Sequence, residues 1–211
     1  MTSAQTSVGY PRKRERTRRR LLRAGLSNVA EKGPAGISAG AIASEAGLAT
    51  GTFYNHFPTV EEFLDAIAHQ VGRGIEIGRA TLAEIEHDPA ARVAIGVLQL
   101  LQMADTDPLA ASTFVKLVGA RPDFRSRVRM LVTEAINDGV DGERFDVEAG
   151  DTSTNAVLGS ALQSMRSLIL GEITHEEATD VTALILRLLG VKAQEIEVIV
   201  TQAMSAVDTT A

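Results

Sequence analysis

The sequence of 211 residues contains no cysteine and no tryptophan, and only 4% of its residues are aromatic. Without cysteine the chain has no disulfide, no thiolate metal ligand and no cysteine nucleophile, which agrees with a reducing cytoplasm. No apolar run reaches the roughly 18–20 residues that a membrane-spanning helix needs. The N-terminal arginines are followed by no apolar signal segment, so we expect a cytoplasmic protein that does not contact a membrane.

The sequence also lacks the signatures of catalysis and of cofactor binding. No H-x-x-x-H or H-E-x-x-H pair, which would place two zinc ligands on one helix face, occurs among His56, His69, His87 and His175. There is no G-x-x-x-x-G-K phosphate loop and no G-x-S-x-G nucleophile turn. We therefore expect no metal, no cofactor and no enzymatic activity.

Charge is distributed unevenly along the chain. Residues 1–60 carry nine Lys and Arg against three Asp and Glu, a net charge of +6, whereas residues 61–211 carry a net charge of −12. A basic N-terminal part on an acidic remainder is typical of a DNA-binding head. The acidic part would repel DNA and so favour one orientation of the head.

Residues 38–57 predict two short helices joined by a tight turn. Ser38 is a favourable N-cap, because its hydroxyl accepts a hydrogen bond from an amide of the first turn. Gly47 can end the first helix with a positive φ, and a second helix is expected over about residues 49–55, with Phe53 facing inward. This pattern predicts a helix-turn-helix, in which the second helix lies in the major groove of DNA.

The second helix is rich in hydrogen-bonding side chains, namely Thr50, Thr52, Tyr54, Asn55 and His56. We expect Thr50, Thr52 and Tyr54 to face DNA, with Tyr54 and His56 mainly on phosphates. Gly51 has two interpretations: it allows the backbone to approach a phosphate closely, or it belongs to a glycine-tolerant surface turn. His56 likewise either contacts DNA or caps the recognition helix.

The run from Gly47 to Phe57, with Ile42-Ala43 before it and Glu61-Glu62-Phe63-Leu64 after it, resembles the DNA-binding domain of TetR-type transcriptional regulators. The resemblance covers about residues 14–68 at the level of motifs. Beyond them it covers only the length and the helical character of the chain. It implies a homodimer with an all-α fold, in which an N-terminal three-helix helix-turn-helix domain precedes a C-terminal helical ligand-binding and dimerisation domain.

On this basis we expect a disordered tail over residues 1–11, the DNA-binding domain over residues 12–57, and the ligand-binding and dimerisation domain over residues 58–208. Two positions depart from the pattern of the family. Ala49 stands where a serine commonly caps the helix or binds phosphate, and Val60 stands where a lysine usually binds phosphate. Both departures remove phosphate contacts and so affect DNA affinity rather than the fold.

Start and stop signals predict the remaining helices, and no stretch alternates with the period of a strand. Asp88-Pro89 and Asp107-Pro108 are caps followed by proline, and Thr59 and Thr174 each begin a capping box. Gly139 is expected to end one helix and to begin a loop over residues 139–150. The predicted helices cover about residues 12–32, 60–85, 90–104, 107–119, 122–139, 152–170, 174–189 and 192–206.

The helices over residues 152–170 and 174–189 are candidates for a dimer interface. The first carries small residues that allow close approach of helices, and the second is apolar around much of its circumference. The interface residues that we expect are Ala156, Ser160, Val181, Leu184, Ile185 and Leu188. The alternative is that these are ordinary core helices of a monomer; the resemblance favours the dimer.

An effector pocket is expected among the fourth to eighth helices. The candidate walls are Gln99, Met103, Phe114, Met130, Gln163 and Arg166, although Met and Phe at helical spacing are also typical of an ordinary core. The surrounding residues are otherwise aliphatic, so the expected ligand is a small hydrophobic or amphipathic molecule.

Arginines follow one edge of the first helix. At about 100° per residue, five of them fall within an arc of roughly 100°: Arg12, Arg16, Arg19, Arg20 and Arg23. This arginine stripe predicts contact with the DNA backbone, with Arg16 and Arg20 as candidates beside Ser38, Ala49 and Gly51 of the helix-turn-helix. The alternative is a charged face exposed to solvent.

Taken together, these patterns favour a ligand-responsive transcriptional repressor that binds palindromic double-stranded DNA as a homodimer. One alternative is an architectural or cell-cycle DNA-binding protein on the same scaffold without a small ligand. Another is an all-helical enzyme or binding protein in which the helix-turn-helix is only a packing device.

Overall fold

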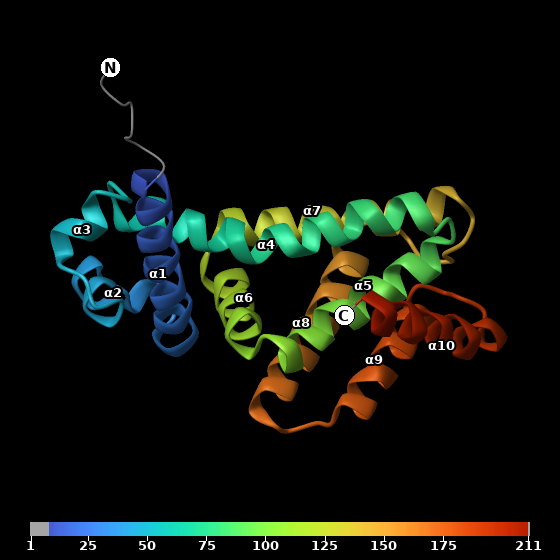
Figure 1. The fold of residues 1–211 in the computed structure, drawn as a ribbon. Coiled ribbons are helices and arrows are strands. Elements are labelled where there is room, and N and C mark those ends of the chain that lie inside the picture. Colours follow the sequence, from blue (N-terminus) through green and yellow to red (C-terminus); the bar gives the residue numbers. More distant parts are fainter. Residues whose placement is uncertain (1–8, 211) are drawn as a thin grey trace, which may run out of the picture. The chain divides into compact units, whose positions relative to one another are not determined.

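The computed structural model describes the backbone of residues 9–210, and their side chains apart from those at positions 9–11, 74–85, 178, 209 and 210. In this part of the chain the fold is all-α, with no strand (Figure 1). A short 3-10 helix, η1 (Pro34–Gly36), follows the first helix. The α-helices are α1 (Gly9–Lys32), α2 (Ala39–Glu45), α3 (Thr50–Tyr54), α4 (Val60–Ile85), α5 (Pro89–Thr106), α6 (Pro108–Ala120), α7 (Pro122–Asp141), α8 (Asp151–Leu170), α9 (His175–Leu188) and α10 (Ala193–Thr210).

The chain divides into two compact units, Met1–Gln70 and Val71–Ala211, and the division falls within α4. The first unit therefore extends past residue 57, where we expected the DNA-binding domain to end. The reason is that Phe63 and Ile67, at the start of α4, are fully buried and lie against Gly25 of α1. At the N-terminal end, α1 begins at Gly9 rather than near Arg12, and residues 1–8 of the expected tail lie outside the described residues.

Local capping signals are confirmed at most predicted helix starts. The Asp88 carboxylate accepts a hydrogen bond from the Ala90 amide at 2.9 Å, and the Asp107 carboxylate accepts one from the Ala110 amide at 3.0 Å. Thr174 forms the complete capping box, in which its hydroxyl accepts from the Glu177 amide and the Glu177 carboxylate accepts from the Thr174 amide. Each cap satisfies amides that have no partner within their own helix.

The second unit is organised around α5, which packs against α6, α7, α8, α9 and α10. Its buried face is built from alanine, isoleucine, valine and leucine, so neighbouring helices approach it closely. Arg144, in the connection after α7, forms ion pairs with Asp88 at the start of α5 and with Glu195 of α10, both at 2.8 Å. No helix in the described residues is long and apolar enough to cross a membrane.

The expected helix end at Gly139 is wrong, because α7 continues to Asp141. Gly139 is buried instead, and its missing side chain makes room for a ring: a Cβ at this position would lie 2.0 Å from the ring of Phe145. The Gly139 carbonyl also accepts hydrogen bonds from the amides of Arg144 and Phe145, at 2.8 and 3.0 Å. Glycine is thus required here for packing, where the sequence pattern indicated a helix stop.

We expect Gly139→Ala to lower the free energy of unfolding by about 1–3 kcal/mol, because the added methyl displaces the Phe145 ring from a filled core. The matched control is Gly96→Ala, in the middle of α5, where a Cβ would meet nothing within 4 Å. This control should raise the free energy of unfolding by about 0.5–1 kcal/mol, through helix propensity alone. Urea unfolding at one protein concentration measures both, and equal effects would contradict the role of Gly139.

Candidate nucleic-acid interface

The predicted helix-turn-helix is present in α2, α3 and the turn between them. Ser38 is the N-cap of α2, and its hydroxyl accepts from the Ala41 amide at 3.2 Å. At the other end of α2, Gly47 has φ +63°, and the amides of Gly47 and Leu48 donate to the carbonyls of Ser44 and Ala43 at 2.9 and 2.8 Å. These two bonds form a Schellman motif, which reverses the chain sharply and leads into α3.

The recognition helix α3 is only five residues long and is anchored through one aromatic residue. Phe53 is fully buried, with its ring centroid 5.7 Å from that of Phe57 and 5.1 Å from that of Phe63. The opposite side of the helix is open: Thr50, Gly51, Tyr54 and Asn55 are exposed, and Thr52 is half-buried. The structure therefore presents the predicted DNA-contacting side chains on one accessible surface.

The two departures from the family pattern have local consequences. Ala49 is the N-cap of α3 and supplies no side-chain hydrogen bond, so the recognition helix begins without a polar cap. Val60 begins α4, whose first turn is capped by Thr59, with its hydroxyl accepting from the Glu62 amide at 3.1 Å. Gly51 is exposed and a Cβ there would meet nothing within 4 Å, so both interpretations of this glycine stand.

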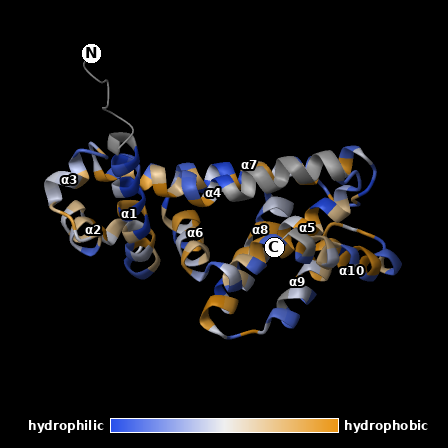
Figure 2. Cartoon of the chain, in the orientation of Figure 1, coloured by the Kyte–Doolittle hydropathy of each residue, from blue (hydrophilic) through white to orange (hydrophobic). Residues whose placement is uncertain are grey.

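The five arginines of the predicted arginine stripe have different surroundings. Arg19 pairs with Glu15 one turn earlier, at 3.0 Å. Arg20 donates to the carbonyls of Ala46 and Gly47 in the helix-turn-helix turn. In the described part of the chain, no hydrogen bond or ion pair is recorded for the other three, which are Arg12, Arg16 and Arg23. The N-terminal half of α1 is accordingly hydrophilic (Figure 2), but its positive charges are not equally available to an anion.

Two further arginines, which the arginine stripe omits, lie beside the end of the recognition helix. The guanidinium of Arg18 stacks over the ring of Phe57 at 5.1 Å, and both Arg14 and Arg18 act electrostatically on His56. Measured from Arg12 at about 100° per residue, Arg14 and Arg18 lie at about 200° and 240° around α1. These angles fall between those of the buried Leu21 and Leu22, at about 180° and 280°. Extending that apolar face toward the N-terminus would have identified them from the sequence.

His56 lies at the C-terminal side of α3 in a positively charged environment. Desolvation by the surrounding protein, followed by the charges of Arg14 and Arg18, holds the pKa of His56 below its ordinary value of 6.5. Glu15 acts in the opposite direction and only partly offsets these effects. In the free protein near neutral pH the imidazole is therefore mainly neutral, which makes it responsive to an approaching anion.

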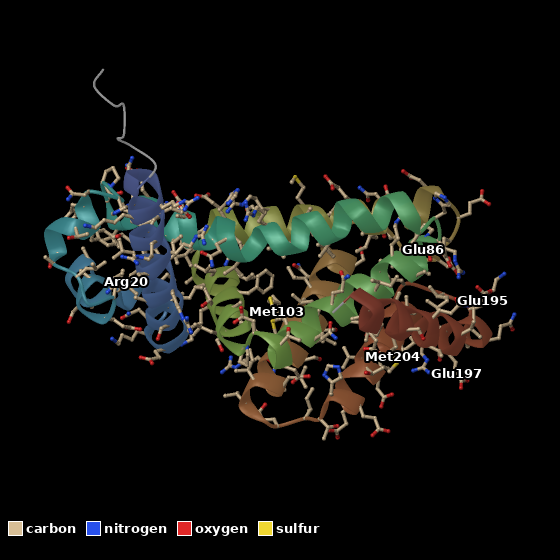
Figure 3. All side chains as sticks on the ribbon, viewed as in Figure 1. Arg20, Glu86, Met103, Glu195, Glu197 and Met204 are labelled. Carbon is tan, nitrogen blue, oxygen red and sulfur yellow. The ribbon has the colours of Figure 1, made fainter. Side chains whose placement is uncertain are left out.

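The structure does not bring the six predicted effector-pocket residues together. Phe114 is buried against Phe124, with ring centroids 5.6 Å apart, and Gln99 and Met103 are half-buried on α5. Met103 projects from α5 toward α6 (Figure 3). Met130, Gln163 and Arg166 are exposed, so they cannot line an enclosed cavity of a single chain. The side chains at positions 74–85 of α4, one of the helices among which the pocket was expected, lie outside the described residues.

The described residues do form an open groove of about 730 Å³, but most of the residues that line it are charged. Its lining consists of His87, Asp88, Pro89, Arg92, Asp138, Asp141, Gly142 and Arg144. Both guanidinium groups in it are ion-paired, Arg92 with Asp138 at 3.1 Å and Arg144 with Asp88. Although burial alone would raise it, the pKa of Asp88 is held below its usual range by the Arg144 hydrogen bond and the Ala90 amide. No group of three His, Cys, Asp or Glu side chains in the described chain is arranged to hold a metal ion.

The predicted dimer-interface residues differ in how exposed they are within their own chain. Leu184 and Leu188 of α9 are 56% and 41% exposed, whereas Val181, Ala156 and Ser160 are half-buried. Ile185 is only 1% exposed and belongs to the core of its own chain, so its assignment to the interface is wrong. The physical reason is that α9 is apolar around much of its circumference, and one face packs within the chain. Leu170 at the end of α8, which we did not predict, is exposed as well.

Comparison with known proteins identifies the class. The model of the tetracyclin repressor-like C-terminal domain matches residues 88–202, more than half of the chain, and the model of the tetR family of bacterial regulatory proteins matches residues 21–67. The chain belongs to the tetR family of transcriptional regulators. An uncharacterized HTH-type transcriptional regulator of Mycobacterium tuberculosis is 34% identical over 113 residues, which are 53% of this chain and 56% of that protein. The chain thus spans little more than half the length of this curated relative, and the same holds for its counterpart in Mycobacterium bovis.

Solved structures share the fold over most of the chain. RolR in complex with resorcinol is 26% identical, with a TM-score of 0.64 over 90% of this chain and 95% of that one. A gamma-butyrolactone receptor is 17% identical, with a TM-score of 0.71 over 94% and 100% of the two chains. The ketosteroid transcriptional regulator KstR2 of Mycobacterium tuberculosis is 18% identical, with a TM-score of 0.62 over 80% and 92%. The last two show the fold alone.

The exposed polar side chains of α3 lead to a prediction about DNA recognition. Tyr54→Phe keeps the ring and removes one hydroxyl, so it should weaken binding to all DNA sequences alike, by about 1–2 kcal/mol for a charge-assisted bond to phosphate. Thr50→Ala should instead change the preferred base at one position of the site. Binding titrations on matched sets of DNA sites measure both effects. Variants that bind every site like the unaltered protein would show that this surface does not face DNA.

The environment of His56 predicts a pH dependence. The pKa of His56 is lowered in the folded chain. The contribution of His56 to the free energy of unfolding is therefore complete above the ordinary pKa, and it declines as the pH falls from there through the lowered pKa. A nearby DNA phosphate would raise this pKa again, so binding takes up a proton and DNA affinity should increase as the pH falls from about 8 to 6. Fluorescence anisotropy at constant ionic strength tests this. His56→Asn should flatten the profile, and an unchanged profile in this variant would assign the effect to another group.

Proposed function

We propose that this regulator is a repressor that binds a palindromic DNA operator as a homodimer and is released by a small hydrophobic or amphipathic effector. The observation that carries the DNA-binding part is the geometry of α3. This helix exposes Thr50, Tyr54 and Asn55 on one side and is fixed by buried Phe53 on the other. Such a helix reads base edges in the major groove, while arginines of α1 such as Arg16 meet phosphates. We propose the cytoplasm as its location, because a regulator acts where its DNA target lies.

The homodimer is supported by an apolar face on the last helices. Val181, Leu184 and Leu188 follow one side of α9 at helical spacing, and Leu170 is exposed at the end of α8. On α8, Gly159 is exposed and a Cβ there would meet nothing within 4 Å, so the chain itself gives no packing reason for glycine. A second copy packed closely on α8 would supply that reason, since glycine otherwise weakens a helix.

The effector class is supported by one relative. RolR, which resembles this chain over most of both lengths, was solved in complex with resorcinol, a small amphipathic molecule. In a dimer the two recognition helices enter successive major grooves about 34–36 Å apart. An effector can bind more tightly to a dimer whose recognition helices are spaced differently from this. It then lowers the DNA affinity by the difference between its binding free energies for the two spacings.

Selection of bound DNA from a random pool is the experiment that tests the proposed function. A two-fold symmetric consensus with half-sites about one helical turn apart supports both the helix-turn-helix and the dimer. A consensus without symmetry contradicts the dimeric reading. Recovery of no preferred sequence at low salt contradicts sequence-specific DNA binding altogether.

The proposed dimer face yields a separate prediction, with one buried and one exposed apolar residue as controls. Leu184→Asp should give a folded monomer, because Leu184 is exposed within its own chain and would be buried by the partner in the proposed dimer. Ile185→Asp should unfold the chain, because an unpaired charge in the core costs several kcal/mol. Met130→Asp, at an exposed apolar residue of α7, should leave the dimer intact. Sedimentation together with circular dichroism distinguishes the three, and a dimeric Leu184→Asp protein would place the interface elsewhere.

A further inference from the structure

Arg20 lies on the arginine stripe of α1, yet its guanidinium is directed at the protein backbone. The Nη2 group donates to the carbonyl of Ala46 at 2.5 Å and to that of Gly47 at 3.5 Å. These residues form the turn between α2 and α3, 26 and 27 positions further along the chain. Figure 3 shows Arg20 on α1 beside this part of the helix-turn-helix. The contact therefore joins the first helix to the segment that leads into the recognition helix.

The carbonyls that Arg20 contacts accept no hydrogen bond from the backbone of the turn itself. The Schellman motif uses the carbonyls of Ala43 and Ser44, and Ala46 donates to Ile42. In the described part of the chain, no backbone amide of a turn or loop donates to the carbonyl of Ala46 or of Gly47. Ala46 is the C-cap of α2 and Gly47 follows it, so both carbonyls lie at the helix end where the dipole is negative and a guanidinium is favourable. A Cβ on Gly47 would lie 3.2 Å from Nη2, so the arginine lies directly over the turn.

We propose that Arg20 is a positioning residue for DNA recognition: it holds the turn before the recognition helix against α1, rather than binding a phosphate. The proposal rests on the DNA-binding function proposed above. It gives Arg20 a role different from that of Arg16, although composition and helical spacing make the two arginines look alike. It follows from the shortness of α3, because five residues without a side-chain cap cannot fix their own direction. Fixing the turn at Ala46 and Gly47 limits the angle at which α3 leaves it.

A positioning residue and a phosphate ligand differ in how their loss affects the salt dependence of binding. Each phosphate contact contributes about 0.9 to the slope of log affinity against log salt concentration, and it does so for all DNA sequences. Base recognition instead requires the recognition helix to lie in one orientation. The contacts with bases determine how much higher the specific affinity is than the non-specific affinity. Loss of Arg20 should reduce this ratio and leave the slope unchanged.

The test compares Arg20→Met with Arg16→Met in the full-length protein. Both substitutions remove one guanidinium from α1 and keep an unbranched side chain, but no intramolecular partner of Arg16 is recorded in the described residues. DNA affinity is measured for the selected site and for a scrambled duplex over a range of salt concentrations. We expect Arg20→Met to lower specific affinity at least about 10-fold, with the slope and the scrambled-duplex affinity unchanged. Arg16→Met should reduce the slope by about 0.9 and weaken both duplexes alike.

Hydrogen exchange of the free protein provides a readout that does not depend on DNA. The amides of Gly47 and Leu48 should exchange faster in Arg20→Met than in the unaltered protein and in Arg16→Met, while the amides of α5 remain unchanged in all three. A slope reduced by about 0.9 in Arg20→Met, or unchanged exchange in the turn, would overturn the positioning role. If the unaltered protein selects no DNA sequence but exchange in the turn still depends on Arg20, the proposed function fails and the contact stands.

Discussion

The structure of the DNA-binding head depends on the burial of one phenylalanine. A helix of five residues is far too short to be stable in water, because helix nucleation costs more than so few hydrogen bonds return. Phe53 provides what α3 lacks, since its fully buried ring lies among those of Phe57 and Phe63. Gly25 of α1 is part of the same arrangement, because a Cβ there would lie 2.2 Å from the Phe63 ring. The recognition surface is thus one side of a helix whose other side is the core.

The buried Phe53 fixes one side of α3, but the direction of the helix axis depends on the segments at its two ends. At its start, Ala49 provides no side-chain cap, so the turn before it has to be ordered by other groups. The Schellman bonds order the turn internally, and the Arg20 guanidinium attaches it to α1. At its end, His56 and Phe57 meet Arg14 and Arg18 of the same helix. Residues of α1 therefore act on the segments before and after α3, although the sequence pattern indicated only a helix with a charged edge.

Sequence patterns predicted those features that depend on neighbours along the chain. The caps at Ser38, Asp88, Asp107 and Thr174 each act on an amide two or three residues away, so a short window contains the whole interaction. Features that depend on distant partners were missed or misassigned. Gly139 resembles a helix stop until the Phe145 ring is placed against it. The apolar stripe of α9 includes Ile185 in the core and Leu184 at the surface, one position apart, and hydrophobicity alone does not indicate which side faces a second chain.

The same limit applies to charge. Net charge and helical angle make all the arginines of the arginine stripe equivalent, and both predict a uniform attraction to DNA. The structure makes them unequal: Arg19 is paired with a carboxylate, Arg20 with two carbonyls, and Arg16 with no recorded partner in the described residues. A guanidinium that already has an internal partner must exchange it to bind a phosphate, so it contributes less to counterion release than its charge suggests. The number of phosphate contacts made by α1 should therefore be smaller than its number of arginines, and internal hydrogen bonds decide which arginines bind DNA.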